Sequence, residues 1–292
     1  MRGAYASVTT ATVVWGTIHP VGKLILRDAT PVQLVLARAS LTGLALVLAL
    51  ALAGRLHLIG AELRNRPIRI LGLGLLSFFL SSGLSMTGLS YLPASVNSLL
   101  ANTSPLMLAA ALLLFQRRLP PGRVVVGLLL GFAGITLLTI RDAADLGAVG
   151  VLGVLLSLGG SLAWALYTWW SRQELQRGDP LAITACAAFV GAVPFAGIAA
   201  VTGQLGGYGD LPSTTLLLLL YAGVVGTALT YSLWMSALRR LSATNVSAFQ
   251  YVIPLTAVTL SVLFLGESVT PALVLGGAAI LVGVGLAQER PR

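Results

Sequence analysis

Cysteine, histidine and acidic residues are scarce in this chain. Cys186 is the only cysteine, which excludes an intrachain disulfide and a cysteine-cluster metal site. Histidine occurs only at His19 and His57, and none of the nine acidic residues lies in the centre of an apolar stretch. An intramembrane enzyme needs a nucleophile with a base, or clustered histidine and carboxylate ligands. The sequence therefore argues against an enzyme and predicts no metal and no cofactor.

Charged residues of either sign are few as well. They make up 9% of the 292 residues, whereas hydrophobic residues make up 57%. A soluble domain of this composition has too little polar surface to cover itself, so we expect lipid to be the solvent. The net charge of +9 would suggest nucleic acid in a soluble protein, but the basic residues occur in short bursts between apolar stretches. Such bursts are typical of topology signals, so we expect the lipid bilayer and a small-molecule substrate as partners, and no nucleic acid.

Long apolar stretches recur ten times, each about 17 to 25 residues, the length that crosses a hydrocarbon core of about 30 Å. Their approximate limits are 4–24, 31–53, 67–90, 93–115, 122–140, 148–171, 180–202, 212–237, 242–265 and 271–288. The N-terminus lacks an Ala-x-Ala cleavage pattern, so we expect the first stretch to be a retained span. The sequence predicts an all-α integral membrane protein with ten transmembrane helices.

Basic residues orient these spans. With the N-terminus in the cytoplasm, the inside ends and loops carry 14 of the 18 basic residues. The outside set is Lys23, Arg27 and Arg141, and the remaining one, Arg38, lies within the second span. Basic residues are enriched in cytoplasmic loops. The sequence therefore predicts a multi-pass protein of the bacterial cytoplasmic (inner) membrane with both termini in the cytoplasm.

The chain also aligns with itself, without a gap, at an offset of 149 residues. The aligned pairs include Trp15 with Trp164, Pro31 with Pro180, Gly54 with Gly203, Pro105 with Pro254, Gly127 with Gly276 and Gly134 with Gly283. We predict two copies of one unit, residues 1–143 and 144–292, with five spans each. An odd number of spans makes the second copy enter the membrane from the opposite side, so the repeats are inverted and meet near mid-bilayer.

The stretch from Leu241 to Leu286 resembles the end of an EamA domain: a small-residue helix, a mid-span proline, a Gly-Glu turn and a glycine-rich last helix follow one another. The copy from Leu92 to Leu137 keeps the proline but has Arg117 and Arg118 at the turn. Two such domains resemble the drug/metabolite transporter superfamily of EamA type, and length and aromatic content resemble its YddG-like amino-acid exporters. This resemblance implies ten helices and transport, commonly outward, of amino acids, metabolites or toxic organic compounds.

Aromatic and polar residues inside the spans are the candidate substrate contacts. Trp15 and Trp164 are paired by the repeat, and each offers a flat wall and an indole N–H donor, although helix packing would also explain them. Tyr167 lies near the face of Trp164. His19 shares a helix face with Trp15 beside the helix-weakening Pro20, so it could bind substrate, carry a proton or simply bond to a neighbouring helix.

The kinked spans provide further candidates. Pro105 and Pro254 are predicted to kink spans four and nine at matching depth, a structural or gating role. Asn102, Gln250 and Tyr251 lie just before these prolines, where they contact either substrate and water or other helices. In spans three and eight, the repeat pairs Ser82 with Tyr231 and Phe78 with Thr227, and these are predicted to line the pathway.

Basic residues in or near the spans have two interpretations each. Arg38 either pairs with Asp28 or with helix carbonyls in a structural or gating role, or recognises an anionic group. Lys23 and Arg172 occupy equivalent positions at opposite faces and are either gate charges or solvated helix ends. Gly127, Gly131, Gly276 and Gly277 are predicted to pack helices within one chain. We expect a monomer to be sufficient, and the alternative use of these glycines is a dimer.

These features predict a secondary transporter of small amphiphilic metabolites, chiefly neutral or aromatic amino acids and also related drugs, that works by alternating access. Because no span has a central carboxylate, we expect facilitated export. A proton-coupled drug/metabolite antiporter using His19 is the alternative. A channel is a more distant one, since no selectivity filter or ring of like charges is present.

Overall fold

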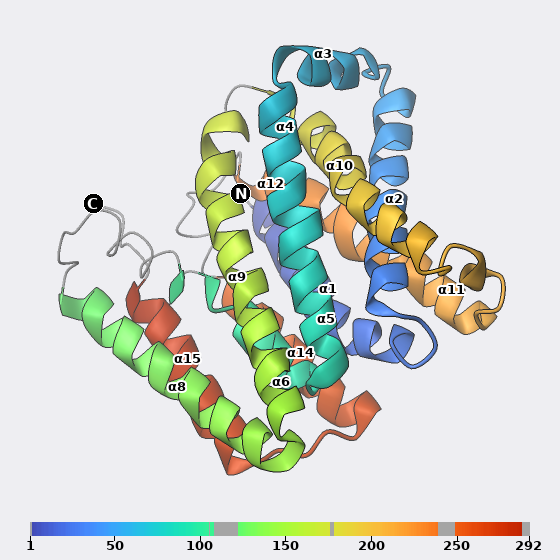
Figure 1. The fold of residues 1–292 in the computed structure, drawn as a ribbon. Helices are drawn as coiled ribbons and strands as arrows, with labels where there is room; N and C mark the ends of the chain where they lie inside the picture. Colours follow the sequence, from blue (N-terminus) through green and yellow to red (C-terminus); the bar gives the residue numbers. More distant parts are fainter. Residues whose placement is uncertain (1, 105, 108–121, 176–177, 239–248, 288–292) are drawn as a thin grey trace.

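The computed structural model describes residues 2–104, 106–107, 122–175, 178–238 and 249–287, and all regular secondary structure in them is helical (Figure 1). The first half of the chain forms α1 (Arg2–Ile25), α2 (Pro31–Leu52), α3 (His57–Asn65), α4 (Pro67–Gly74), π-helical η1 (Leu75–Ser82), α5 (Gly83–Tyr91), α6 (Ala94–Ala101) and α8 (Gly122–Leu146). The second half forms α9 (Ala148–Leu175), α10 (Pro180–Val201), the 3-10 turn η2 (Gly206–Tyr208), α11 (Ser213–Leu220), π-helical η3 (Tyr221–Leu229), α12 (Thr230–Leu238), the 3-10 turn η4 (Phe249–Tyr251), α14 (Val252–Leu265) and α15 (Pro271–Ala287).

These helices confirm the predicted all-helical fold class. Five of them are long and apolar enough to cross a membrane by length and composition alone: 31–52, 67–91, 148–171, 180–201 and 213–234. Shorter apolar helices occupy 122–137, 252–265 and 271–283. Predicted spans 93–115 and 242–265 extend into residues outside the described ranges. Helix α3 was not predicted, because nine residues of mixed polarity give no long apolar stretch.

Helices α2 and α10 begin and end in the same way, 149 residues apart. At the start of α2, the Thr30 hydroxyl accepts the Gln33 N–H and Gln33 Oε1 accepts the Thr30 N–H, a capping box. At the start of α10, Asp179 Oδ1 accepts the N–H groups of Leu181 and Ala182. The glycines that follow the two helices, Gly54 and Gly203, have φ of 67° and 73°, a left-handed conformation that only glycine adopts without strain.

Side chains at these ends show that α2 and α10 run antiparallel. The Thr30 hydroxyl donates to Gln204 Oε1, just past the end of α10, and Arg55, just past the end of α2, forms an ion pair with Asp179. Each helix therefore starts beside the end of the other. Because α2 and α10 are equivalent helices of the two copies, their antiparallel packing inverts one copy relative to the other.

Helices α8 and α15, the last of each copy, repeat this arrangement and lie side by side at the lower left of Figure 1. A Cβ atom built on Gly134 would lie 2.5 Å from the Gly276 carbonyl oxygen, and one built on Gly283 would lie 2.5 Å from the Gly127 carbonyl oxygen. The two contacts are exchanged by the 149-residue repeat. The glycines thus bring the backbones of α8 and α15 into contact within one chain.

Packing between the other helices follows the same exchange. Helix α1 packs on α12 and α14, and its equivalent α9 packs on α5 and α6. Helix α2 packs on η3, and its equivalent α10 packs on η1. Both π-helical segments occupy the same stretch of their copies, since η1 corresponds to residues 224–231 and η3 covers 221–229. The predicted boundary after residue 143 falls in the last turn of α8, the chain turns at Gly147, and that boundary stays a prediction.

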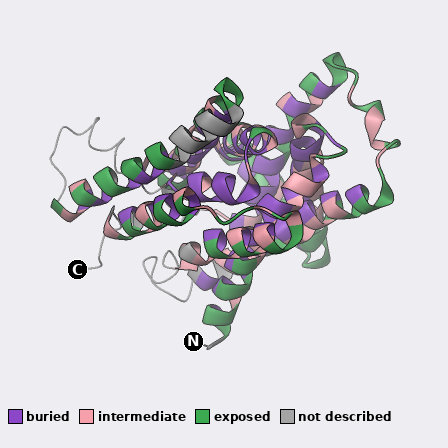
Figure 2. Ribbon diagram, turned by 90° about the horizontal axis from the view of Figure 1, so that it is seen from below, coloured by how far each residue is buried: buried purple, intermediate pink, exposed green. Residues whose placement is uncertain are grey.

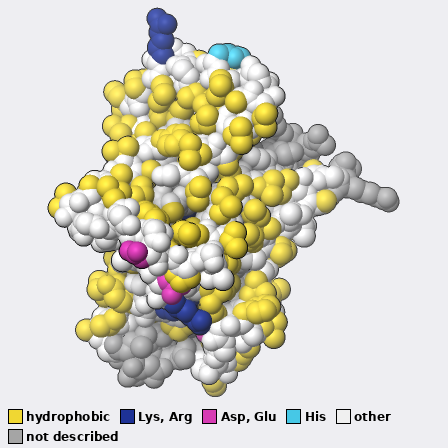
Figure 3. All heavy atoms as spheres, turned by 90° about the vertical axis from the view of Figure 1, so that its right-hand side faces the viewer, with side chains coloured by type: hydrophobic (Ala, Val, Ile, Leu, Met, Phe, Trp, Pro, Cys, Tyr) yellow, Lys and Arg dark blue, Asp and Glu magenta, His cyan; other side chains and the backbone are white. Residues whose placement is uncertain are grey.

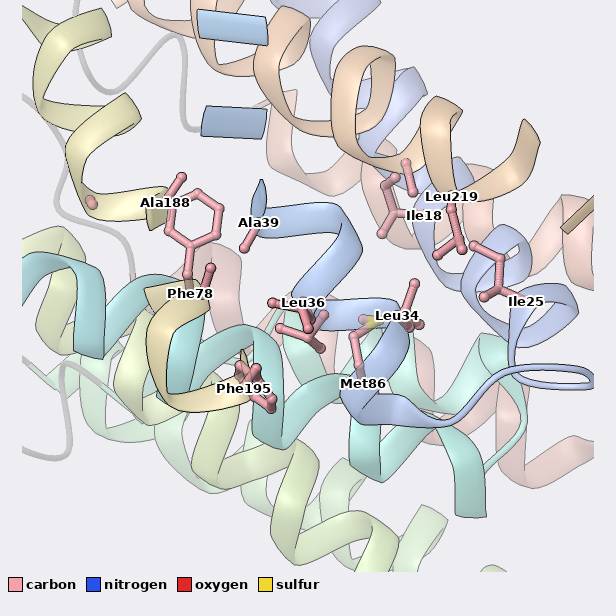
Figure 4. Close-up of a cluster of buried hydrophobic side chains, with 14 of the residues drawn as sticks. Ile18, Ile25, Leu34, Leu36, Ala39, Phe78, Met86, Ala188, Phe195 and Leu219 are labelled. Carbon is pink, nitrogen blue, oxygen red and sulfur yellow. The ribbon is translucent and has the colours of Figure 1, made fainter. Parts of the chain in front are cut away.

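Burial divides the molecule into a closed interior and an apolar exterior. Buried residues concentrate inside the bundle (Figure 2), where Phe78 of η1 lies beside Ala39 of α2 and Ala188 of α10 (Figure 4). Hydrophobic side chains spread over the middle of one outer face, and its charged side chains gather toward the top and the lower part (Figure 3). Leu52 and Val201 are 82% and 90% exposed. A helical protein with so apolar an exterior is a multi-pass membrane protein.

Candidate functional site

A cavity of about 150 Å³ lies between the two copies, with room for several water molecules. Its wall draws on α1, α2, η1, α5, α9, α12, η4 and α14, and on the segment where α6 ends. The lining residues are Trp15, Ile18, His19, Arg38, Phe78, Ser81, Ser82, Ser85, Met86, Ala101, Asn102, Ser104, Gly160, Ser161, Trp164, Tyr231, Gln250 and Ile253. No Asp or Glu is among these described lining residues.

Aromatic rings form one side of the cavity. The Tyr231 ring lies 5.7 Å from the Trp15 ring and 6.2 Å from the Trp164 ring, edge-on to both. The Phe78 ring stacks on the Tyr231 ring, with 6.5 Å between the ring centres. Edge-to-face contacts at these distances are the arrangement that the ring quadrupoles favour. The predicted aromatic pair, Trp15 and Trp164, is therefore joined through the ring of Tyr231.

Hydroxyl groups from η1 and α5 form another part of the wall. Ser81, Ser82 and Ser85 line the cavity together with Phe78. In the equivalent segment η3, the Thr227 hydroxyl donates to the Ala222 carbonyl five residues earlier, a spacing that follows the wider π-helical turn. π-Helical turns are frequent at functional sites. Here η1 and η3 lie in spans three and eight, which supply the side chains of Phe78, Ser82 and Tyr231.

A buried amide sets the orientation of His19. Asn97 of α6 is fully buried, and its Nδ2 donates to the Ser85 carbonyl and to Ser157 Oγ. Ser157 Oγ donates its own proton to the Gly153 carbonyl, so it must accept from Asn97. The Asn97 Oδ1 atom is therefore the one that faces His19 Nδ1, 2.8 Å away, and Nδ1 carries a hydrogen. In the neutral imidazole this leaves the Nε2 lone pair as an acceptor.

Arg38 lies in the cavity wall, and Thr227 holds it. Arg38 Nε donates to Thr227 Oγ1 at 2.9 Å. The hypothesis that Arg38 pairs with Asp28 is not met, because Asp28 accepts the hydroxyl of Thr215 at the start of α11. The packing of α11 on α2 brings Thr215 to the Asp28 carboxylate.

The fourth span is interrupted at the cavity. Helix α6 ends at Ala101, Asn102 follows it, and Asn102 Nδ2 donates back to the Ser98 carbonyl at 2.8 Å. In the second copy the equivalent position is Tyr251, where η4 gives way to α14. Gln250 of η4 lines the cavity, and its equivalent in the first copy is Ala101. At both of these helix boundaries a side-chain amide, from Asn102 or from Gln250, lines the cavity.

Several predicted site residues lie elsewhere. The buried Tyr167 packs on the Trp164 ring at 5.1 Å and is not in the lining, and Thr227 lies behind Arg38. Pro254 is buried in the first turn of α14 and is not among the lining residues, although the preceding Ile253 is. Pro105 and the side chains of Tyr251 and Arg172 lie outside the residues that the structure describes.

Lys23 is neither exposed nor paired with a carboxylate. Its Nζ donates to the carbonyls of Leu89 and Leu92 at 2.9 and 2.7 Å, which ties the end of α1 to the last turn of α5 and the residue that follows it. The Glu267 carboxylate, on the turn between α14 and α15, accepts the N–H groups of Ala94 and Ser95 and caps α6. These contacts hold α1, α5, α6 and the α14–α15 turn together at the face predicted to be outside.

The candidates predicted from the sequence did not include Asn97, Ser81, Ser85, Ser104 and Ser161, although Ser81 and Ser85 belong to the same polar flank of span three as Ser82. A signal for Asn97 was present, since an amide in an apolar stretch must find partners. Asn102 was chosen as the candidate of this span instead, because it lies next to the predicted kink. Single serines carry no such signal, because each can bond to its own helix. Within the described ranges, no group of three or more His, Cys, Asp or Glu side chains could hold a metal ion.

Known proteins resemble this chain over nearly its whole length. The model described as "EamA-like transporter family" matches residues 3–140 and again residues 151–287. "Uncharacterized transporter YvbV" of Bacillus subtilis is 28% identical and covers 96% of this chain and 90% of its own length. "Uncharacterized transporter YwfM" of the same organism is 26% identical over 98% of this chain and 93% of its own. One solved crystal structure, 18% identical, has the same fold with a TM-score of 0.66, covering 97% of this chain and 95% of that one.

Proposed function

Because this chain belongs to the EamA-like transporter family, we propose that it exports small zwitterionic or amphiphilic solutes, neutral and aromatic amino acids foremost, by alternating access through the central cavity. It is a facilitative carrier in this proposal, without a coupling ion. The membrane is the bacterial cytoplasmic membrane, and both termini face the cytoplasm.

One observation supports the proposal most: the cavity lies where the inverted copies meet, and its wall contains repeat-related pairs. Trp15 and Trp164 form one pair, and Ser82 and Tyr231 form another. Inverted repeats allow a carrier to open to either side by nearly equivalent motions around a fixed site. Aromatic faces with amides and hydroxyls, and no carboxylate among the described lining residues, suit an apolar side chain with a small polar end.

Counterflow in liposomes tests the proposal. Purified protein is placed in liposomes loaded with one unlabelled amino acid, and uptake of the same labelled amino acid is measured, across the twenty amino acids and a few aromatic cations. We expect saturable exchange of neutral and aromatic amino acids, reduced by Trp164→Ala because the substrate loses one aromatic wall. If no amino acid and no aromatic cation exchanges, the proposal is wrong. Exchange that does not saturate would indicate a channel instead.

The energy source is tested with a pH gradient. A facilitative carrier equilibrates its solute, so a gradient of about two pH units should produce no accumulation above the equilibrium level. The His19 Nε2 lone pair in the cavity wall is the observation that favours the proton-coupled alternative. Accumulation driven by the gradient in the wild-type protein, and its loss in His19→Gln, would establish antiport and refute facilitated export.

The proposed topology predicts opposite labelling of two equivalent residues. Leu56 and Leu205 are 149 positions apart, follow the ends of α2 and α10, and are both about half exposed, at 47% and 48%. In a Cys186→Ala background, a membrane-impermeant maleimide should label Leu205→Cys in intact cells and Leu56→Cys only after permeabilisation. Labelling of both from the same side would contradict the inverted arrangement, and the reverse pattern would place the termini outside.

A further inference from the structure

Arg38 carries a positive charge into the cavity wall at membrane depth. It lies in α2 about two turns after the start of that helix, and the rings of Trp15, Phe78 and Tyr231 line the same cavity. A guanidinium has five N–H groups, one on Nε and four on the terminal nitrogens. Only the Nε group has a partner among the described residues, the hydroxyl of Thr227. The four terminal N–H groups are thus left for the cavity.

The orientation of this guanidinium is determined by its one bond. The Thr227 hydroxyl is buried and has given its proton to the Ala222 carbonyl, so it can only accept from Arg38. The guanidinium is planar, and a fixed Nε therefore fixes the plane of the terminal nitrogens. The guanidinium is therefore already oriented before a ligand enters the cavity.

A counter-ion for Arg38 is missing from the described part of the chain. Five carboxylates have described side chains: Asp179 pairs with Arg55, Glu62 with Arg66, Asp28 accepts from Thr215, Glu267 caps α6, and Asp210 is exposed. None of them lines the cavity. An unpaired cation inside a membrane protein costs several kcal/mol of free energy, so such cations are paired or functional.

We propose that Arg38 binds the carboxylate of the transported solute, which supplies the missing counter-ion; this inference rests on the proposed function and narrows its substrate class. The guanidinium fork matches a carboxylate with two parallel hydrogen bonds. The repeat gives no second such site, because the position equivalent to Arg38 is Ala187. The carboxylate of the solute therefore binds only on the α2 side of the cavity.

Acceptors elsewhere in the wall suit the rest of an amino acid. His19 presents Nε2 once Nδ1 donates to Asn97, and Asn102 presents Oδ1 once Nδ2 donates to Ser98. An ammonium group has three N–H donors that such atoms accept. The solute class is thus a small carboxylate, best with an ammonium group and an apolar or aromatic side chain, and amines without a carboxylate are excluded.

Three matched probes test the assignment: phenylalanine, phenethylamine without the carboxylate, and 3-phenylpropionate without the ammonium group. Binding to detergent-purified protein is measured by calorimetry, beside phenylalanine counterflow. We expect phenylalanine and phenylpropionate to bind about 10- to 100-fold more tightly than phenethylamine. Arg38→Gln should lose this preference, Arg38→Lys should keep part of it, and Arg64→Gln, at an exposed position of α3, should bind as the wild type does.

The wild-type protein alone gives a second test that does not depend on how the variants fold. Benzoate should compete with phenylalanine for binding, and benzylamine should not. If phenethylamine binds as well as phenylalanine, or benzylamine competes as well as benzoate, Arg38 is not a carboxylate site although the transporter proposal stands. An Arg38→Gln protein that folds and still prefers carboxylates also excludes a carboxylate site at Arg38. Absence of any binding together with absence of counterflow overturns the proposed function itself.

Discussion

Replacing Asn97 with leucine is expected to destabilise the protein and to abolish most transport. Leucine has nearly the same size, but it cannot bond to His19 Nδ1, the Ser85 carbonyl or Ser157 Oγ. Each buried polar group left without a partner costs about 1–3 kcal/mol. Because these groups belong to α1, α5 and α9, one substitution loosens three helices around the cavity. We expect the melting temperature in detergent to fall by roughly 5–15 °C and counterflow to fall more than about tenfold.

The matched control is Asn65→Leu, at the exposed end of α3, which should change stability by no more than about 0.5 kcal/mol. A double-mutant cycle with His19→Leu separates the free energy of the Asn97–His19 hydrogen bond from that of the other hydrogen bonds of Asn97. If Asn97 acts on His19, the double variant should be more stable than the sum of the two single losses predicts. Wild-type melting and transport in Asn97→Leu would show that the amide network does not hold the cavity together.

Alanine at Gly134 or at Gly283 is expected to cause the second large loss, this time in stability. The added Cβ atoms would lie 2.5 Å from the carbonyl oxygens of Gly276 and Gly127, and backbone atoms cannot rotate away. Helices α8 and α15 must separate, with the loss of their contact along several turns. Forcing even one methyl group into close packing costs about 1–3 kcal/mol, and equal losses are expected at the two positions because the repeat exchanges them.

Gly197→Ala is the control for this pair. Gly197 lies in the helical α10 with no atom within 4 Å of its added Cβ, so alanine should be neutral or stabilising there by up to about 1 kcal/mol. Thermal unfolding in detergent, followed by size-exclusion chromatography, measures all three variants. If Gly134→Ala and Gly197→Ala melt alike, the close backbone contact between α8 and α15 is not what stabilises this pair.

Much of the fold could be predicted from residues with strong local effects. Pro31 and Pro180 mark helix starts because proline is best tolerated in the first turn, and Gly54 and Gly203 mark helix ends because of their backbone conformation. The odd number of spans per copy predicted an inverted repeat, and the antiparallel pair of α2 and α10 agrees with it. The π-helical turns were not predicted, because no residue type in 75–82 or 221–229 distinguishes them from ordinary helix.

The candidate site was predictable only where a residue is large or its pairing is rare. Trp15 and Trp164 were found by their repetition, and both line the cavity. Tyr167 lies near the helix face of Trp164 by spacing, yet it packs on the Trp164 ring without lining the cavity, since the neighbouring helices decide how deeply a helix face is buried. Lys23 was interpreted as a gate charge or a solvated end, and the carbonyls that it binds belong to a turn more than sixty residues away.

The lipid surroundings and the two copies could be predicted from the chain alone, and so could the opposite orientation of the copies, because apolar length, clusters of basic residues and a fixed repeat offset are properties of the chain. Which polar side chains meet around the cavity depends on the tertiary structure. Asn97 with His19 and Arg38 with Thr227 are joined across 78 and 189 residues. Such partnerships depend on helix rotation and depth, which the packing of every other helix sets, so no local pattern encodes them.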